Sequence, residues 1–230
     1  MARRKQASRA RIAIVAVVVA ALAAVAWFGY QRFNLRLNEA IAYKIAPIDV
    51  TADRIDPGNE GRHLRIVGNL AVDKPPRDPQ LGVSADTPIL FRHVEMYQWR
   101  EQCAGANCRY ATEWSAQPID SHKFRTPAGH ENPAPPFASA RFVAGEIHLG
   151  AFTADPELAA AQLNSVDFPV QAASLPPNLA ASFHDVDGVL YAGGDPAHPV
   201  VGALRVSYRI MPIGAVTLTG AQRGAKLVAH

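Results

Sequence analysis

Both cysteines of the chain lie five positions apart in the segment VEMYQWREQCAGANCRYATEWS, residues 94–115, which also holds two of the three tryptophans. A cysteine pair can bind zinc, take part in catalysis or close a disulfide. A structural zinc site takes four ligands, whereas this sequence supplies one cysteine pair and no histidine at zinc-finger spacing. We therefore expect no metal site and no cofactor at Cys103 and Cys108.

Asp120, His122 and His130 are a second group that could do chemistry, as acid–base groups of a hydrolase or as metal ligands. The motif His130-Glu131-Asn132-Pro133 lacks the second histidine that a zinc helix carries, and its proline disfavours a helix. No serine stands in a Gly-x-Ser-x-Gly context. The sequence favours a protein that is not an enzyme. A membrane-tethered hydrolase or binding module that uses these three residues is the alternative.

The N-terminal segment determines the compartment of these residues. Residues 12–30 are 19 consecutive positions without a charge, and a helix of that length reaches roughly 28 Å, close to the thickness of a bilayer core. Five basic residues precede this run, which favours a cytoplasmic N-terminus. We expect a basic cytoplasmic segment at residues 1–11, a transmembrane helix at 12–30 whose helical period extends to about residue 46, and an extracytoplasmic domain at 47–230.

A cleaved secretory signal is the alternative, because Ala24-Val25-Ala26 has the small residues of a cleavage site. The apolar run continues into Trp27 and Phe28, which favours an uncleaved, single-pass signal-anchor. Both alternatives export the rest of the chain. Five of the 23 Lys and Arg residues lie in the first eleven positions, which leaves 18 against 20 Asp and Glu. The net charge of +3 is therefore no sign of nucleic-acid binding.

The exported part has the pattern of an α+β domain that is predominantly β. In residues 200–210, Leu204, Val206, Tyr208 and Ile210 alternate with polar or small residues, as in a half-buried strand. Further strands are predicted at residues 63–70, 88–103, 108–115 and 140–150. One short helix is predicted at residues 156–163, because Asp155 can cap it and a proline suits its first position.

A hairpin follows if residues 104–107 form the turn between two of these strands. The register then pairs residue 103 with 108, 101 with 110, 99 with 112 and 97 with 114. One face carries Tyr97, Trp99, Tyr110 and Trp114, and the other places Gln98 beside Glu113 with Arg100 diagonal to it. In an exported compartment Cys103 and Cys108 could close this turn as a periplasmic disulfide. We interpret the aromatic cluster as packed scaffold, with an exposed interaction platform as the alternative.

Six segments follow one another in a recognisable order. They are Asn59-x-Gly61-Arg62, Val94-Glu95-Met96-Tyr97-Gln98-Trp99, Tyr110-x-Thr112-Glu113-Trp114, Ile119-Asp120-Ser121-x-x-Phe124, Gly129-His130-x-Asn132-Pro133 and Val201-Gly202-x-Leu204-Arg205-Val206-Ser207-Tyr208. Together they resemble the transmembrane protein 43 (LUMA) family over about residues 45–228. The resemblance implies an N-terminal membrane span, a large extracytoplasmic or lumenal domain, and self-association or scaffolding of membrane complexes.

Members of that family usually continue into a cluster of C-terminal membrane spans. The present sequence has no second apolar run of spanning length. We expect a fragment or a short, bacterial-type, single-pass member. On these grounds we expect a non-enzymatic scaffold in the inner (cytoplasmic) membrane, whose large domain lies on the extracytoplasmic side and binds itself or other envelope membrane proteins.

Overall fold

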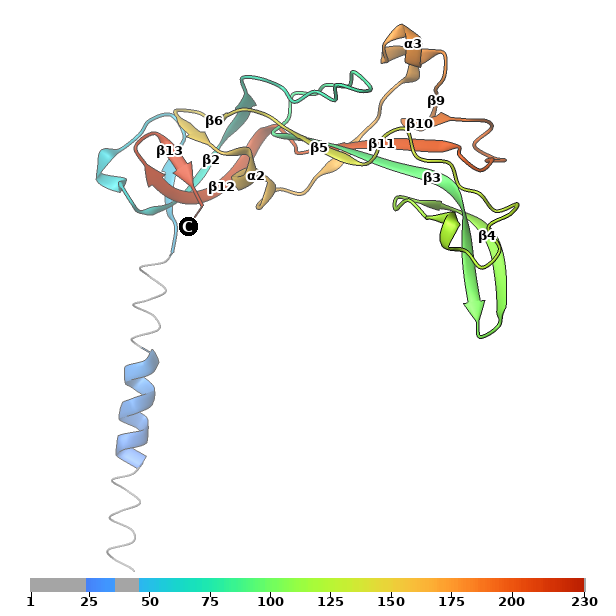
Figure 1. The fold of residues 1–230 in the computed structure, drawn as a ribbon. Coiled ribbons are helices and arrows are strands. Elements are labelled where there is room, and N and C mark those ends of the chain that lie inside the picture. Colours follow the sequence, from blue (N-terminus) through green and yellow to red (C-terminus); the bar gives the residue numbers. More distant parts are fainter. Residues whose placement is uncertain (1–23, 36–45, 230) are drawn as a thin grey trace, which may run out of the picture. The chain divides into compact units, whose positions relative to one another are not determined.

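The computed structural model describes residues 24–35 and 46–229, and the chain divides into two units, residues 1–47 and 48–230. In the first unit, residues 24–35 form a helix (Figure 1). Residues 24–30 are the part of the predicted membrane span that belongs to the described chain; residues 12–23 of that span lie outside it, as do residues 36–45 of its predicted continuation. No helix within the described residues has the length and apolarity needed to cross a membrane. The membrane span stays a prediction.

The described part of the second unit contains two β-sheets. The first has six strands, namely β1 (Ile48–Thr51), β2 (His63–Val72), β12 (Gly214–Arg223), β13 (Lys226–Val228), β7 (Phe152–Ala154) and β6 (Ile147–Leu149), in that order. The end of β2 also pairs with β6, so the sheet closes into a ring that begins and ends at β2. Side chains with no exposed surface, among them Leu64, Ile66 and Leu218, form its core.

The second sheet has seven strands arranged around the long strand β3 (Ile89–Ala104). One edge of β3 pairs with β11 (Leu204–Ile210), which is followed by β10 (Val189–Ala192) and β9 (His184–Val186). The other strands are β4 (Asn107–Ser115) and β5 (Ala140–Val143), which pair with β3, and β8 (Val166–Phe168), which pairs with β11. Alternation puts Leu90, Val94 and Met96 of β3 on the buried face, opposite Val206 and Leu204 of β11.

A buried charged cluster joins this sheet to a neighbouring loop. Asp78 is fully buried and accepts hydrogen bonds from Arg92 at 2.7 Å and from the Tyr208 hydroxyl at 2.6 Å. Arg92, which is 4% exposed, also donates to Gln80 and to the carbonyl of Ala138. Burial next to the carboxylate raises the pKa of Tyr208. Every charge in this cluster has a partner, which is the condition under which buried charges are tolerated.

The helices of the second unit are short. They are α2 (Pro156–Ala160), α3 (Pro177–Ala180) and the 3-10 turns η1 (Pro57–Asn59), η2 (Ser121–Lys123) and η3 (Ala172–Ser174). The predicted cap is confirmed, because the Asp155 carboxylate accepts from the backbone N–H of Glu157 at 2.9 Å. The helix ends at Ala160, earlier than the predicted residue 163.

The predominantly β fold class is confirmed, and β2, β3 and β4 lie close to their predicted positions. The prediction of one strand at residues 140–150 was wrong: β5 and β6 belong to different sheets, and the chain leaves the extended pairing between them at residues 144–146. The predicted strand 200–210 begins only at Leu204, because residues 201–202 form a turn in which Gly202 has a φ of +92°.

Candidate functional site

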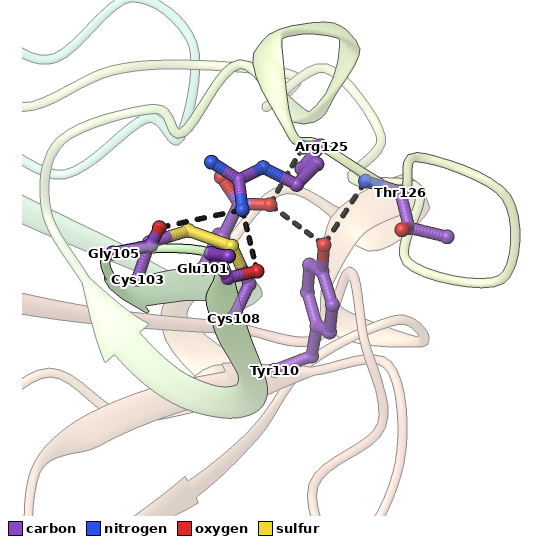
Figure 2. Close-up of a disulfide and its surroundings, with 8 residues drawn as sticks. Glu101, Cys103, Gly105, Cys108, Tyr110, Arg125 and Thr126 are labelled. Atoms are coloured by element: carbon purple, nitrogen blue, oxygen red, sulfur yellow. Dashed lines mark hydrogen bonds between the residues drawn. A yellow bond between two sulfur atoms is a disulfide. The ribbon is translucent and has the colours of Figure 1, made fainter.

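The β3–β4 hairpin has the register predicted from the sequence. Tyr97 pairs with Trp114, residue 99 with 112, residue 101 with 110 and residue 103 with 108. Cys103 and Cys108 form a disulfide, with their Cα atoms 4.0 Å apart (Figure 2). On the opposite face of the hairpin, the predicted neighbour Arg100 donates to the Glu113 carboxylate at 2.7 Å. A covalent link therefore closes the hairpin at its turn, and an ion pair crosses its strands.

The chain returns over the aromatic face of this hairpin through residues 119–132, which we call the covering segment. Its residue His130 packs between two of the aromatic rings predicted from the sequence. The imidazole lies edge-on to Trp99, with ring centroids 4.8 Å apart, and stacks on Tyr110 at 3.8 Å. Phe124 of the same segment also contacts Tyr110, at 6.0 Å. Two of the four aromatic residues are thus partly covered by the chain itself.

Hydrogen bonds hold the covering segment to the disulfide-closed turn (Figure 2). Glu101 accepts from the Tyr110 hydroxyl and from the backbone N–H of Arg125, both at 2.6 Å. Arg125 donates to the carbonyl of Ala106 at 2.6 Å, and the backbone N–H of Thr126 donates to the Tyr110 hydroxyl at 3.0 Å. The hydroxyl of Tyr110 and then the N–H of Arg125 lower the pKa of Glu101.

Two side-chain amides, those of Asn132 and Gln98, fix the two ends of the covering segment. The backbone N–H of Trp99 donates to Oδ1 of Asn132 at 2.7 Å, and Nδ2 of Asn132 donates to the backbone carbonyl of Trp99 at 2.9 Å. Gln98, only 1% exposed, accepts from the N–H of Ile119 at 2.8 Å and donates to the carbonyl of Gln117 at 3.2 Å. These amides take the place that backbone groups of a further strand would occupy.

Beyond the covering segment, the same face of the sheet carries three half-exposed rings and one exposed ring, which we call the aromatic surface. It comprises Tyr97, Trp114, Tyr191 and His184. The ring of Trp114 lies 5.3 Å from that of Tyr97 and 6.3 Å from that of Tyr191. The Arg205 guanidinium lies 4.8 Å from the Trp114 ring and donates to Glu95 at 2.5 Å. Arg205 thereby lowers the pKa of Glu95.

The four aromatic residues predicted from the sequence are all half-buried and lie outside the two hydrophobic cores of the described chain. The buried face of β3 is the opposite one, which carries Met96 and Gln98. The sequence pattern misled on this point, because the aromatic face appeared to be the more apolar of the two. The interaction role of Tyr97, Trp99, Tyr110 and Trp114 remains a proposal.

The candidate catalytic residues lie in two different local structures, Asp120 and His122 at η2 and His130 over the hairpin. The Asp120 carboxylate caps η2 by accepting from the His122 N–H at 3.1 Å, and it pairs with Lys123 at 3.2 Å. The side chain of His122 is exposed, whereas Nδ1 of His130 lies 3.1 Å from the carbonyl of Thr126. Within the described residues, no contact among the three side chains brings them into a common acid–base arrangement.

One group of possible metal ligands contains the cysteines. The carboxylate of Glu101 and the sulfur atoms of Cys103 and Cys108 lie within 4.8 Å of one another. Metal binding by cysteine requires the thiolate, and both sulfurs are bound to each other in the disulfide. The residues do not fit a metal in this redox state, in line with the expectation of a disulfide.

The sequence reasoning missed Gln98, Arg125 and Asn132 as organising residues and Arg205 as a partner of Trp114. Arg125 and Asn132 lie in a loop, where polar residues carry no periodic signal that reveals their hydrogen-bond partners. The burial of Gln98 could have been inferred from its place on the face of β3 that also carries Met96, since alternate residues share a face.

Comparison with known proteins gives consistent matches. The family model described as Transmembrane protein 43 matches residues 96–230. The Homo sapiens protein Transmembrane protein 43 is 30% identical over 216 residues, which is 84% of this chain and 52% of the human one. The Drosophila melanogaster protein Transmembrane protein 43 homolog is 27% identical over 213 residues, 85% of this chain and 55% of its own. The chain spans about half the length of these relatives. No solved structure matches.

Proposed function

The chain belongs to the transmembrane protein 43 family, and from this premise we propose that it is a non-enzymatic, membrane-anchored scaffold that organises membrane protein complexes. The relatives are named as transmembrane proteins, which supports a membrane protein. In this proposal the second unit binds another copy of the chain or other envelope membrane proteins.

The observation that carries the proposal is the half-exposed aromatic surface at Trp114. Tryptophan, tyrosine and arginine are enriched at protein interfaces, because large rings bury much apolar area with little loss of conformational entropy. Trp114 is held in place by Tyr97, Tyr191 and the Arg205 guanidinium. Since its neighbours already fix its orientation, the Trp114 side chain would lose little further conformational entropy when a partner binds there.

The disulfide supports the proposed position of the second unit on the extracytoplasmic side of the inner membrane. Disulfides persist in oxidising compartments and are rare in the cytosol. The basic residues at positions 3–11 and the uncharged run at 12–30 support a cytoplasmic N-terminus and a single span.

The alternative of a hydrolase or binding module that uses Asp120, His122 and His130 has less support. A catalytic group needs side chains that converge on one reacting atom. Here His130 packs between aromatic rings and Asp120 caps η2.

The proposal is tested by purifying the full chain from membranes in mild detergent and identifying the proteins bound to it. Trp114→Ala should lower the recovered partners, including further copies, by about tenfold or more. Phe91→Ala is the matched control, because Phe91 is also half-buried, lies on the same face of β3 and packs under an arginine, Arg141, at 5.8 Å. It should leave recovery unchanged. Purification of the wild-type chain as a monomer with no bound protein at any concentration would refute the proposal.

A further inference from the structure

Strand β4 offers an open hydrogen-bonding edge. Tyr97 and Trp99 of β3 direct their backbone groups away from β4: the N–H of Tyr97 donates to the Ala203 carbonyl at 2.8 Å, and that of Trp99 donates to Asn132. Since the bonding side alternates along an antiparallel strand, Gln98 and Arg100 bond to β4 instead.

The register then determines which residues of β4 face outward. Gln98 pairs with Glu113 and Arg100 with Ala111, so residues 109, 111 and 113 bond to β3. The outward backbone groups belong to residues 108, 110, 112 and 114. Across the described residues, no backbone hydrogen bond outside the hairpin occupies these groups. β4 has nine residues and no proline, whereas β8 and β9 have three residues each.

At two other strand edges of the second unit, a side-chain amide bonds to backbone groups that no neighbouring strand pairs with. In the described chain, β4 has no such amide at its outer edge. The side chain of Gln162 accepts from the N–H of Thr219 and donates to its carbonyl, both at 2.7 Å, at the edge of β12. Asn132 does the same for Trp99 at the edge of β3. An uncapped strand edge of this length is a template for pairing with another strand.

The charges on β4 are self-complementary. Arg109 and Glu113 lie two residues before and after Ala111 and share its face of the strand. In an antiparallel pairing of two copies with Ala111 opposite Ala111, Arg109 of each copy lies opposite Glu113 of the other. This register also places residue 110 opposite 112 and residue 108 opposite 114, so that the outward backbone groups meet. Centring the pairing on residue 110 or 112 instead would put neither charge opposite its complement.

We propose that two copies of this chain associate through antiparallel pairing of their β4 edges about a twofold axis at Ala111. The inference rests on the proposed self-association and names its surface. Glu113 already binds Arg100 of its own copy at 2.7 Å, and in the dimer it also faces Arg109 of the second copy. Arg109 is exposed and has no ion pair within the described residues, so it is available for this contact. Isologous pairing of one surface with itself is the commonest symmetry of soluble oligomers.

The test is charge exchange in the full chain, purified in mild detergent. Arg109→Glu places carboxylates opposite one another, and Glu113→Lys places cations opposite one another. Each variant alone should associate about tenfold or more weakly than wild type, because like charges face each other. An equimolar mixture of the two variants should associate again, since each mutated charge then meets its complement. Lys74→Glu, which makes the same charge change at an exposed residue of a separate loop, should associate as wild type.

Cysteine cross-linking tests the register. Ala111→Cys should form a disulfide-linked dimer on mild oxidation, whereas Ala128→Cys, at another exposed alanine, should not. The equimolar mixture of Arg109→Glu and Glu113→Lys also controls for folding in the charge-exchange test, because misfolded variants would not regain association.

Three outcomes would overturn the proposal. Self-association of Arg109→Glu at wild-type strength would refute the β4 interface and leave the scaffold function standing. A wild-type monomer that still binds other membrane proteins would do the same. A monomer that binds no protein would refute both.

Discussion

The side-chain amide of Asn132 pairs with the backbone of Trp99 in the way that a residue of a neighbouring strand would. Oδ1 accepts from the Trp99 N–H at 2.7 Å, and Nδ2 donates to the Trp99 carbonyl at 2.9 Å. The same Nδ2 donates to the carbonyl of Ile119 at 3.1 Å, and the backbone N–H of Asn132 donates to Ser121 at 2.9 Å. One asparagine therefore extends the sheet beyond the first residue of β11 and ties both ends of the covering segment to the hairpin.

Asn132→Asp should destabilise the fold, because a carboxylate oxygen would replace the donor that faces two carbonyl groups. We expect a loss of about 2–3 kcal/mol in the free energy of unfolding at neutral pH, from partners left unsatisfied. Urea unfolding of the full chain in detergent, followed by tryptophan fluorescence, measures it. Asn69→Asp is the matched control, since Asn69 is exposed on β2. Equal losses for both variants would contradict this role.

The hairpin could be predicted from the sequence because its information is local. A short turn between two alternating segments determines which residues face each other, and the predicted pairing of Tyr97 with Trp114 and of Cys103 with Cys108 is confirmed. Which face becomes buried depends on what else folds against the sheet. Val170, Leu175 and Phe183 belong to the core of this sheet and lie about 70 to 90 positions further on in the chain, and no local pattern shows that they pack there.

The closed first sheet could not be predicted for a related reason. Its closure needs β2 to pair with β12, about 150 positions away, and with β6. β12 has glycine at both positions 214 and 220, which weakens its strand pattern. Gly220 is required, since a Cβ there would lie 2.5 Å from the carbonyl oxygen of Val228. The backbone of β12 thus approaches β13 so closely that only glycine fits at position 220, and glycine disfavours a strand in sequence-based prediction.

Asp78→Asn should be among the most destabilising single substitutions in the second unit. It keeps the shape of the side chain but leaves the buried guanidinium of Arg92 without its counter-charge, which costs about 3–5 kcal/mol. Asp49→Asn removes one partner of an exposed ion pair, that with Arg65 at 2.6 Å, and should lower the free energy of unfolding far less, because water screens exposed pairs. Urea unfolding of both variants measures the two losses in the free energy of unfolding. Similar losses would show that burial does not increase the cost of breaking the pair between Asp78 and Arg92.

Replacing both cysteines, Cys103→Ser and Cys108→Ser together, should lower the free energy of unfolding by about 2 kcal/mol, because the closed loop is short. The hairpin should persist, since Arg125 still binds the Ala106 carbonyl and Glu101 still binds Tyr110. Unfolding curves with and without reductant measure the effect. Reductant should destabilise the wild-type chain by a similar amount and leave the double variant unchanged. Loss of all cooperative unfolding in the double variant would contradict the proposed persistence of the hairpin.

Glu101 should make the contact between hairpin and covering segment dependent on pH. The pKa of this carboxyl is lowered from its ordinary value of 4.5 by hydrogen bonds from the Tyr110 hydroxyl and the Arg125 N–H. Because the pKa of Glu101 is lower in the folded chain, the unfolded chain binds the proton more readily. The free energy of unfolding therefore falls as the pH drops below the unfolded-state pKa and through the folded-state pKa. The contribution of Glu101 is therefore complete at pH 7 and is lost in acid.

Glu101→Gln removes the ionisable group and isolates this effect from other carboxylates, which both chains share. The variant should be less stable than wild type at pH 7, and the difference in the free energy of unfolding should narrow between pH 5 and pH 3 as the wild type loses its contribution. Glu146→Gln is the control, since the only polar contact of the Glu146 side chain with another described residue is an exposed ion pair with Lys226 at 4.0 Å. Its difference from wild type should stay small throughout, because exposed pairs contribute little. A difference for Glu101→Gln that stays constant from pH 7 to pH 3 would show that the carboxylate charge does not hold the covering segment in place.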